Sequence, residues 1–361
     1  MKITGLRTDI VHVPLPTPIP SSLGVIEHAG CILVHLETDV GMVGEGLAFT
    51  VNGRRSDVLL AAIRSYEPLV LGSEPEFGGG FWQAAWNGMG FFGHRGIAVL
   101  GLAPLDMAIM DLRAKKAGVN VARLLGACRQ SVPVYASGGL RLSASIDGLQ
   151  TEASAILARG FRALKMSLGK PSTAEDVARV RAVRDAVGPG VTLMADANQQ
   201  LTAARAIHLG RALEAFELAW IEEPVPYHDH AAEAAVAAAL ATPIASGENE
   251  YTRLGMMEML RLQSADILMP DLQRMGGPTE FMKVAHMAEG FGIPISSHLF
   301  TEMSLPLMAA IPNGMVLEHM PWFSPLYREP VTLDAKGHAI VPDRPGWGFS
   351  FDPDAIARFR V

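Results

Sequence analysis

The chain has 361 residues, 49% hydrophobic and 19% charged, which is the composition of a folded globular protein with a large core. A formal net charge of -7 without a Lys/Arg cluster argues against nucleic acid or an anionic membrane as partners, and no apolar run is long enough to span a bilayer. Only two cysteines and a polar N-terminus without an apolar signal region predict a reducing, cytoplasmic location.

The first third of the chain predicts an α+β unit over residues 1–128. Apolar and polar residues alternate in runs at 10–13, 31–36 and 42–44, which is typical of an antiparallel meander. We expect the Pro- and Ser-rich stretch 14–24 to be a long functional loop. The glycines of 41–46 stand in the wrong order for a nucleotide loop and are interpreted as a β-turn. From 56 to 119 the apolar period becomes helical, and we predict three helices.

The middle of the chain, residues 129–324, alternates short apolar strands with Ala-rich amphipathic helices. Such alternation predicts right-handed parallel crossovers that close a (β/α) barrel. The eight predicted strands are 132–137, 163–167, 192–196, 220–222, 243–248, 267–271, 294–298 and 316–318. The last interval is the shortest, so the last helix is expected to be irregular. Residues 325–361 are rich in Pro and Gly and are expected to return to the N-terminal unit.

Charged residues recur at the carboxyl ends of predicted strands two to eight. In chain order they are Lys165, Asp196, Glu222, Glu248, Asp271, His298 and Glu318. Because all strand ends of a barrel meet on one face, and barrel enzymes keep their active sites there, these seven groups should converge. Any one of them alone has a structural explanation, but their register favours a catalytic site.

Three of these groups are carboxylates on adjacent strands, Asp196, Glu222 and Glu248. Three negative charges close together at one face of the barrel need a compensating cation. A hard divalent ion with oxygen ligands, Mg²⁺, fits this donor set best.

The best candidate for a catalytic base is His298, the one histidine among these charged strand ends, at the end of an apolar strand. Asp271 precedes it by one strand, so its carboxylate can accept the Nδ1 proton and fix the tautomer. Lys165 would face the histidine from the opposite side. Glu318, which follows the apolar Leu317, would be protonated and donate a hydrogen bond to an enolate oxygen.

Several segments together resemble the mandelate racemase subgroup of the enolase superfamily over nearly the whole chain. They are residues 3–8, 160–165, 220–224, 292–300 and 341–346. The resemblance implies an α/β fold, a (β/α)₇β modified TIM barrel with an N-terminal α+β capping domain completed by the C-terminal segment. It also implies Mg²⁺ on the carboxylate trio, an Asp271/His298 dyad, Glu318 as electrophilic partner, and Ser137 and Asn198 near the substrate carboxylate or 2-hydroxyl. The shared step of the family is abstraction of the proton α to a carboxylate, which gives an enediolate. A homo-oligomer, often an octamer, is implied as well.

One departure from the family pattern decides which overall reaction we expect. Its Lys-x-Lys motif reads Lys165-Met166-Ser167 here, so the second lysine is missing. Racemisation needs bases on both faces, and a serine without a partner base does not take an α-proton at neutral pH. We therefore predict a one-base dehydration of an acid sugar, with His298 as base. Epimerisation or racemisation through Lys165, and lactone cycloisomerisation, are the alternatives; a catalytically inactive acid-binding barrel is an alternative of another class.

The loops of the N-terminal unit are expected to select the small-molecule carboxylate substrate. Ser21 and Ser22 in the first loop, and Arg54 and Arg55 near residue 50, are more polar than an aromatic substrate requires. We hypothesise that Arg54 or Arg55 meets a hydroxylated or second acidic group. Two solvated arginines are an equally good interpretation.

Overall fold

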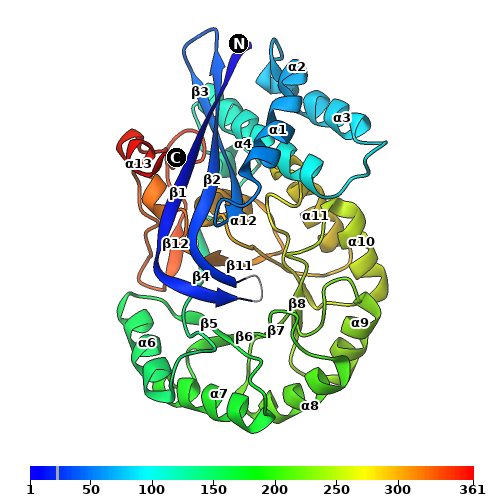
Figure 1. Ribbon diagram of the computed structural model, residues 1–361, viewed down its shortest axis with the longest axis vertical. Helices are drawn as coiled ribbons and strands as arrows, with labels where there is room; N and C mark the ends of the chain where they lie inside the picture. The colour runs from blue at the N-terminus through cyan, green and yellow to red at the C-terminus, as the bar shows by residue number, and fades with distance from the viewer. Residues whose placement is uncertain (22–23) are drawn as a thin grey trace.

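The computed structural model describes residues 1–21 and 24–361 of the chain. Its first unit is an antiparallel sheet in the order β1-β2-β3, formed by Ile3–Ser21 (β1), Gly24–Thr38 (β2) and Val43–Val51 (β3). The sheet alternates buried and partly exposed residues along β1, where Val11 and Val13 are buried among the core. Figure 1 shows these long strands crossing from the outer end of the unit to the mouth of the second domain.

The predicted loop at 14–24 is wrong for most of its length, because β1 and β2 continue through it. After an irregularity between Pro14 and Ile19 the two strands pair again, with Ile19 opposite Ile26. Prolines stand at 14, 16, 18 and 20, and Pro16 and Pro18 lie in the interruption, where the pairing does not need their missing N–H groups. An edge strand tolerates that loss, so this Pro-rich sequence forms an extended hairpin arm.

Helices follow the sheet in the chain, and the longest of them packs on β2 and β3. They are Ser56–Ser65 (α1), Glu67–Val70 (α2), Gly78–Gly88 (α3), Ile97–Ala117 (α4) and Val121–Leu124 (α5). The three longer ones agree with the predicted three, and the two four-residue helices were not predicted. Gly44 and Gly46 of β3 lie against the backbone of Pro104 and Ala108 in α4, with no space for a Cβ. The glycines taken for a turn therefore serve mainly for close packing of a helix on a strand.

The second domain is a closed parallel barrel of eight strands. In chain order they are Ser131–Ala136 (β4), Ala163–Ser167 (β5), Thr192–Asp196 (β6), Ile221–Glu222 (β7), Ile244–Ser246 (β8), Ile267–Leu268 (β9), Ile295–Ser296 (β10) and Gly314–His319 (β11). Each strand pairs with the next in sequence, and β11 pairs with β4 to close the ring. The fold class expected from the sequence is confirmed.

Seven helices connect the eight strands in the described part of the chain. They are Ile146–Ala158 (α6), Thr173–Val187 (α7), Ala203–Leu213 (α8), His230–Ala239 (α9), Thr252–Leu262 (α10), Pro278–Gly290 (α11) and Thr301–Ala310 (α12). The expectation that the last helix is irregular is wrong: α12 is regular over ten residues, all of them buried, and it contains Pro306. It is buried on every side, so it shows no amphipathic period in the sequence.

The C-terminal segment contacts both units. His338–Ile340 (β12) pairs antiparallel with β4 of the barrel. Further on, the Trp347 indole donates to the carbonyls of Glu45 at 3.3 Å and Met107 at 3.2 Å. Pro353–Phe359 (α13) lies beside β1, and Arg360 bonds Asp9 at 2.7 Å (Figure 1).

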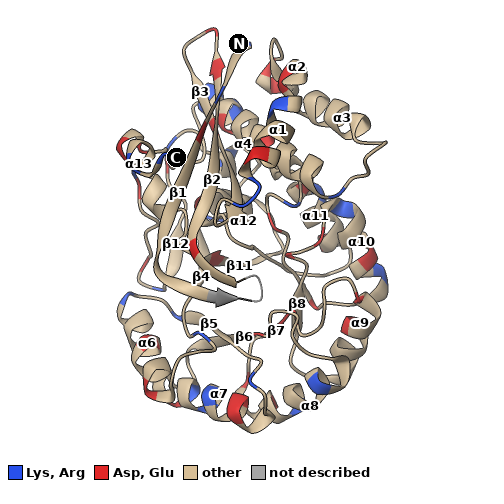
Figure 2. Ribbon diagram, viewed as in Figure 1, with Lys and Arg blue, Asp and Glu red and all other residues tan. Residues whose placement is uncertain are grey.

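Charges of both signs are interspersed on the outer surface. Figure 2 shows Lys and Arg next to Asp and Glu along the outer helices, including α7 and α10. None of the helices in the described residues is long and apolar enough to cross a bilayer.

Candidate active site

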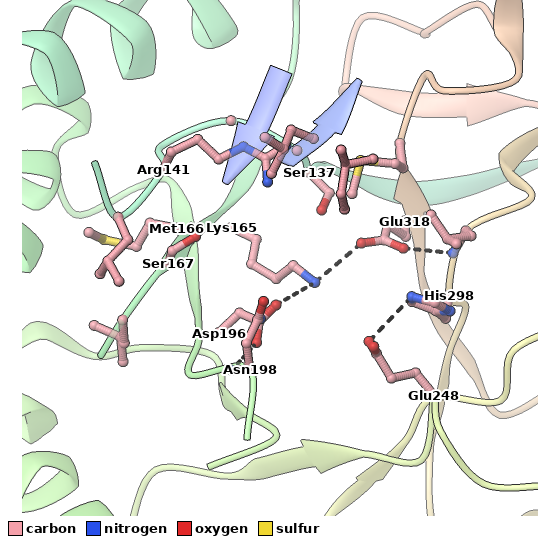
Figure 3. Close-up of a pocket in the computed structure, with 18 of the residues that line it drawn as sticks. Ser137, Arg141, Lys165, Met166, Ser167, Asp196, Asn198, Glu248, His298 and Glu318 are labelled. Carbon is pink, nitrogen blue, oxygen red and sulfur yellow. Dashed lines mark hydrogen bonds and ion pairs between the residues drawn. The ribbon is translucent and has the colours of Figure 1, made fainter. Parts of the chain in front are cut away.

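A cavity of about 490 Å³ opens at the carboxyl ends of the barrel strands. Its walls come from the barrel loops, and Ile19 and Ile26 of the β1–β2 hairpin cover it from the first unit. Lys165, Asp196, Glu248, His298 and Glu318 all line it, as Figure 3 shows. Five of the seven charged strand ends that the sequence singled out thus share one cavity. The other two, Glu222 and Asp271, lie behind this lining and contact Lys165 and His298.

Lys165 lies at the centre of the charged cluster. Its Nζ is 2.5 Å from Oε1 of Glu222, 3.2 Å from Oε1 of Glu318 and 3.6 Å from Oδ2 of Asp196. The side chain also lies over the ring of Tyr135, at 5.5 Å from the centroid. Burial acts to lower the pKa of Lys165, but Glu222 and the other anionic neighbours hold it well above the ordinary value. The ammonium form therefore dominates at neutral pH.

The three carboxylates expected to hold a metal end neighbouring strands. Asp196 and Glu222 are register partners in β6 and β7, and Glu248 follows β8. Among the residues described, however, no group of three His, Cys, Asp or Glu side chains is arranged around a common metal position. Glu222 turns to Lys165, while Oε2 of Glu248 lies 3.3 Å from Nε2 of His298. Glu222 and Glu248 are therefore each paired with one cationic side chain in this arrangement.

Glu222 is completely buried. Its Oε2 accepts a hydrogen bond from the Trp220 indole at 2.9 Å, which fixes the side chain from below. Burial raises the pKa of Glu222 to about 8; Lys165 opposes that rise, and the carboxylates of Asp196, Glu248 and Glu318 add to it. A further cation in the site would lower this pKa.

The predicted dyad is formed. Nδ1 of His298 is 2.8 Å from Oδ2 of Asp271, and the backbone N–H of Arg274 donates to Oδ1 of Asp271 at 2.8 Å. Burial tends to lower the pKa of His298, but Glu248 and Asp271 raise it to about 9. Burial likewise opposes ionisation of Asp271, yet His298 and Arg274 lower its pKa below the usual range. In this arrangement the histidine is protonated at neutral pH.

Glu318 differs from the expected protonated acid. Its Oε1 lies 3.2 Å from Lys165 Nζ, and its Oε2 accepts the backbone N–H of Leu299 at 2.7 Å. Burial would raise the pKa of Glu318, but Lys165, His298 and the Leu299 N–H together lower it to about 2. Both oxygens accept hydrogen bonds, so Glu318 is a carboxylate here.

The predicted substrate-binding residues fall into two groups. Ser137, Asn198 and Ser167 line the cavity. The buried Ser137 hydroxyl lies next to Glu318 and contributes to the lowered pKa of that carboxyl, and the Asn198 backbone N–H donates to Asp196 at 2.8 Å. Arg54 and Arg55 are exposed at the start of α1 and do not line the cavity. The side chain of Ser21, and Ser22 as a whole, lie outside the described residues.

Two basic cavity residues were missed by the sequence analysis, Arg141 in the β4–α6 loop and Lys170 in the β5–α7 loop. They follow the ends of their strands by a few residues instead of standing at the strand end itself. Their position within βα loops was the available signal, since loops at this face carry function in barrels.

Comparison with known protein families accounts for this architecture. Residues 5–126 match the mandelate racemase / muconate lactonizing enzyme N-terminal domain, and residues 148–355 match the enolase C-terminal domain-like family. The chain belongs to the mandelate racemase/muconate lactonizing enzyme family of the enolase superfamily.

Members of this family similar to the chain include two curated enzymes. One is the 3,6-anhydro-alpha-L-galactonate cycloisomerase of Streptomyces coelicolor, 34% identical over 99% of both chains. The other is the L-talarate/galactarate dehydratase of Salmonella typhimurium, 32% identical over 98% of this chain and 90% of the relative. Acid-sugar dehydratases and cycloisomerases are therefore both among the relatives at this level of identity.

A solved family structure covers the whole chain. The L-talarate dehydratase of Polaromonas sp. JS666, complexed with Mg and L-glucarate, superimposes with a TM-score of 0.92 at 34% identity, covering 100% of this chain and 98% of that one. Relatives in this family thus bind Mg together with a small carboxylate.

Proposed function

We propose that this protein is a Mg²⁺-dependent dehydratase that converts an acid sugar to a 2-keto-3-deoxy acid. The observation that carries the proposal is the asymmetry of the cavity. One wall holds the His298/Asp271 pair at 2.8 Å, while the position of a second base on the other wall holds Ser167. A single base suits β-elimination, whereas racemisation needs one on each face.

Asp196, Glu222 and Glu248 are the residues that would hold the ion. They are oxygen donors from three successive strand ends. Burial and repulsion between the carboxylates raise the pKa values of Glu222 and Glu248. A bound cation would stabilise the ionised form of all three side chains. When bound, Mg²⁺ supplies charge neutralisation and Lewis acidity at the substrate carboxylate.

His298 is the residue that moves the proton. Asp271 accepts the hydrogen bond from Nδ1, so Nε2 points to the cavity side, 3.3 Å from Glu248. The imidazole takes the C2 proton in its neutral form, and Asp271 stabilises the imidazolium that results. Binding of substrate must therefore be accompanied by release of the His298–Glu248 contact.

Lys165 and Glu318 are the remaining charged side chains at the reacting end of the substrate. The Lys165 ammonium is available to the substrate carboxylate and to the enediolate as negative charge develops there. Glu318 holds Lys165 in place at 3.2 Å, and acting as a hydrogen-bond donor would require it first to take up a proton.

The elimination balances within this set of residues. The C2–H bond breaks toward His298, the C2–C3 double bond forms, and the C3–O bond breaks as the imidazolium returns its proton, releasing water. The enol then ketonises to the 2-keto-3-deoxy acid.

A cycloisomerase is the second candidate, because two relatives with that activity are 34% and 32% identical to this chain. Epimerisation through Lys165 is less favoured, since its carboxylate partners hold its pKa well above the ordinary value and an ammonium ion is no base. An inactive acid-binding barrel would gain nothing from the buried, mutually repelling carboxylates.

The test is incubation with Mg²⁺ in D₂O and a panel of monoacid and diacid sugars, their lactones and mandelate, followed by NMR. A keto acid that disappears in His298→Asn and with chelator establishes the dehydratase. Lactone turnover establishes the cycloisomerase; deuterium at C2 with inversion and no keto acid refutes the one-base reaction; no exchange with any acid refutes the enzyme. A cytoplasmic homo-oligomer remains part of the proposal, and light scattering tests the assembly.

A further inference from the structure

Two basic side chains line the cavity in addition to Lys165. Lys165 is matched by Glu222 and Glu318 in the cluster, and it lies next to the proposed metal ligands. Arg141 and Lys170 line the same cavity from two adjacent barrel loops. We infer that Arg141 and Lys170 form an anion subsite for the second carboxylate of a dicarboxylic acid sugar, an inference that rests on the proposed function.

Arg141 is directed into the cavity, as Figure 3 shows, and is partly buried. Its guanidinium forms no hydrogen bond or ion pair with the described residues. The carboxylates that act on it electrostatically are Glu152 and Asp196. Glu152 accepts the Leu140 N–H at 2.9 Å, and Asp196 accepts the Asn198 N–H at 2.8 Å, so both are engaged elsewhere. A fork of N–H donors is left facing the cavity.

The loop that carries Arg141 is fixed by buried charge. Arg179 of α7, only 4% exposed, donates to the carbonyl of Arg141 at 2.7 Å and to that of Ala144 at 2.8 Å. Glu152 of α6 holds the loop from the other side through Leu140. These contacts fix the main chain from which the Arg141 side chain enters the cavity.

The Lys170 loop is fixed by the same helix. The fully buried carboxylate of Asp176 in α7 accepts the backbone N–H groups of Gly169 and Lys170, the shortest at 3.0 Å. The guanidinium of Arg205 in α8 donates to the Lys170 carbonyl. The partly buried Lys170 ammonium forms no ion pair with a carboxylate of the described chain. Asp176 and Arg179 thus position both loops from one face of α7.

The charge balance then favours a dianionic substrate. The substrate carboxylate next to the reacting carbon would interact with Lys165 and with the Mg²⁺ ion of the proposed metal site. Two further cations in a covered cavity leave one end of a monoacid with unmatched positive charge, whereas a diacid supplies the anion. Arg141 and Lys170, which line the cavity, would therefore recognise a second acidic group, and the exposed Arg54 and Arg55 would not.

The test compares galactarate with galactonate, which differ in the carboxylate or hydroxymethyl group at C6. Calorimetry with Mg²⁺ in a His298→Asn background measures both dissociation constants without turnover. We expect galactarate to bind about 10-fold to 100-fold more tightly. Arg141→Gln and Lys170→Met should each reduce that ratio strongly while leaving the galactonate constant nearly unchanged. Arg211→Gln, an exposed arginine on α8, is the matched control.

The inference is overturned if galactarate binds no tighter than galactonate, or if its preference survives both substitutions. Turnover separates this result from the proposed function. Wild-type protein that dehydrates both acids equally retains the function and loses the subsite. Protein that turns over neither acid, but whose galactarate preference depends on Arg141 and Lys170, retains the subsite and loses the dehydratase.

Discussion

Nδ1 of His298 lies 2.8 Å from Oδ2 of Asp271, although the two residues are 27 positions apart and follow different strands. An isolated β-bridge between the same two residues brings their backbones together, so the barrel itself sets the geometry of the pair. The carboxylate therefore affects both the orientation and the proton affinity of the imidazole.

Replacing Asp271 by Asn should lower kcat by about 10²–10⁴-fold. Burial lowers the pKa of His298 while Glu248 and Asp271 raise it, so loss of the Asp271 charge moves this pKa down from about 9. A base acts when deprotonated, so the acidic limb of kcat/KM should shift to lower pH. Rate measurements across pH check this, and a limb that stays in place would show that another group controls it.

Removal of Mg²⁺ should abolish activity and lower Tm. A ligand at 100 times its Kd stabilises the native state by about 2.7 kcal/mol, and the carboxylate trio is the proposed source of that binding. Glu222→Gln should therefore show a much smaller rise in Tm with added Mg²⁺ than the wild type. Glu214→Gln, outside the cavity on the barrel surface, serves as the control; equal shifts in all three proteins would place the ion elsewhere.

His230 should stabilise the fold in a pH-dependent way. Glu233 and Glu250 raise the pKa of its imidazole to about 9, and Nε2 lies 3.2 Å from Glu250. Because the folded pKa exceeds the unfolded value, the stabilisation is complete below about pH 6.5 and is lost as pH rises through about 9. The free energy of unfolding of His230→Gln should approach that of the wild type at high pH. The control His286→Gln, whose side chain is 58% exposed, should show little change.

Gly46→Ala should destabilise the first unit. A methyl group at this position of β3 would overlap the Pro104 carbonyl of α4, and overpacking of this kind costs about 1–3 kcal/mol. Gly79→Ala, at an exposed helical position with open space around it, should be neutral or slightly stabilising. Urea unfolding measures both, and equal stability of the two variants would contradict the packing argument.

The barrel and its charged strand ends were predictable from sequence, because strands two to eight are apolar runs that each end in an ionisable residue. The pairing of His298 with Asp271 could be predicted because the two residues end neighbouring strands of a closed barrel. The protonation of Glu318 was not predictable, since it depends on the Leu299 N–H and the reach of Lys165 across the barrel. Those contacts join residues far apart in the chain.

Two other errors have local causes. Prolines between 14 and 20 were interpreted as a loop, but the strand pairing is only interrupted between Pro14 and Ile19 and resumes at Ile19 opposite Ile26. Residues of α12 lack polar spacing because the helix is buried on all sides, so nothing in its pattern distinguishes it from an irregular connection. Arg141 and Lys170 lie in loops beyond the strand ends. Strand spacing does not predict where loop residues lie, so the sequence did not indicate that these two line the same cavity.

The meeting of Arg360 with Asp9 constrains the order in which the protein is built. The first strand is complete early in synthesis, yet its bridge from Val11 to Arg360 and the Trp347 contacts to the first unit require the last part of the chain. Domains generally fold as units during synthesis, N-terminal first. Here the first unit acquires these contacts only after the whole barrel has been made.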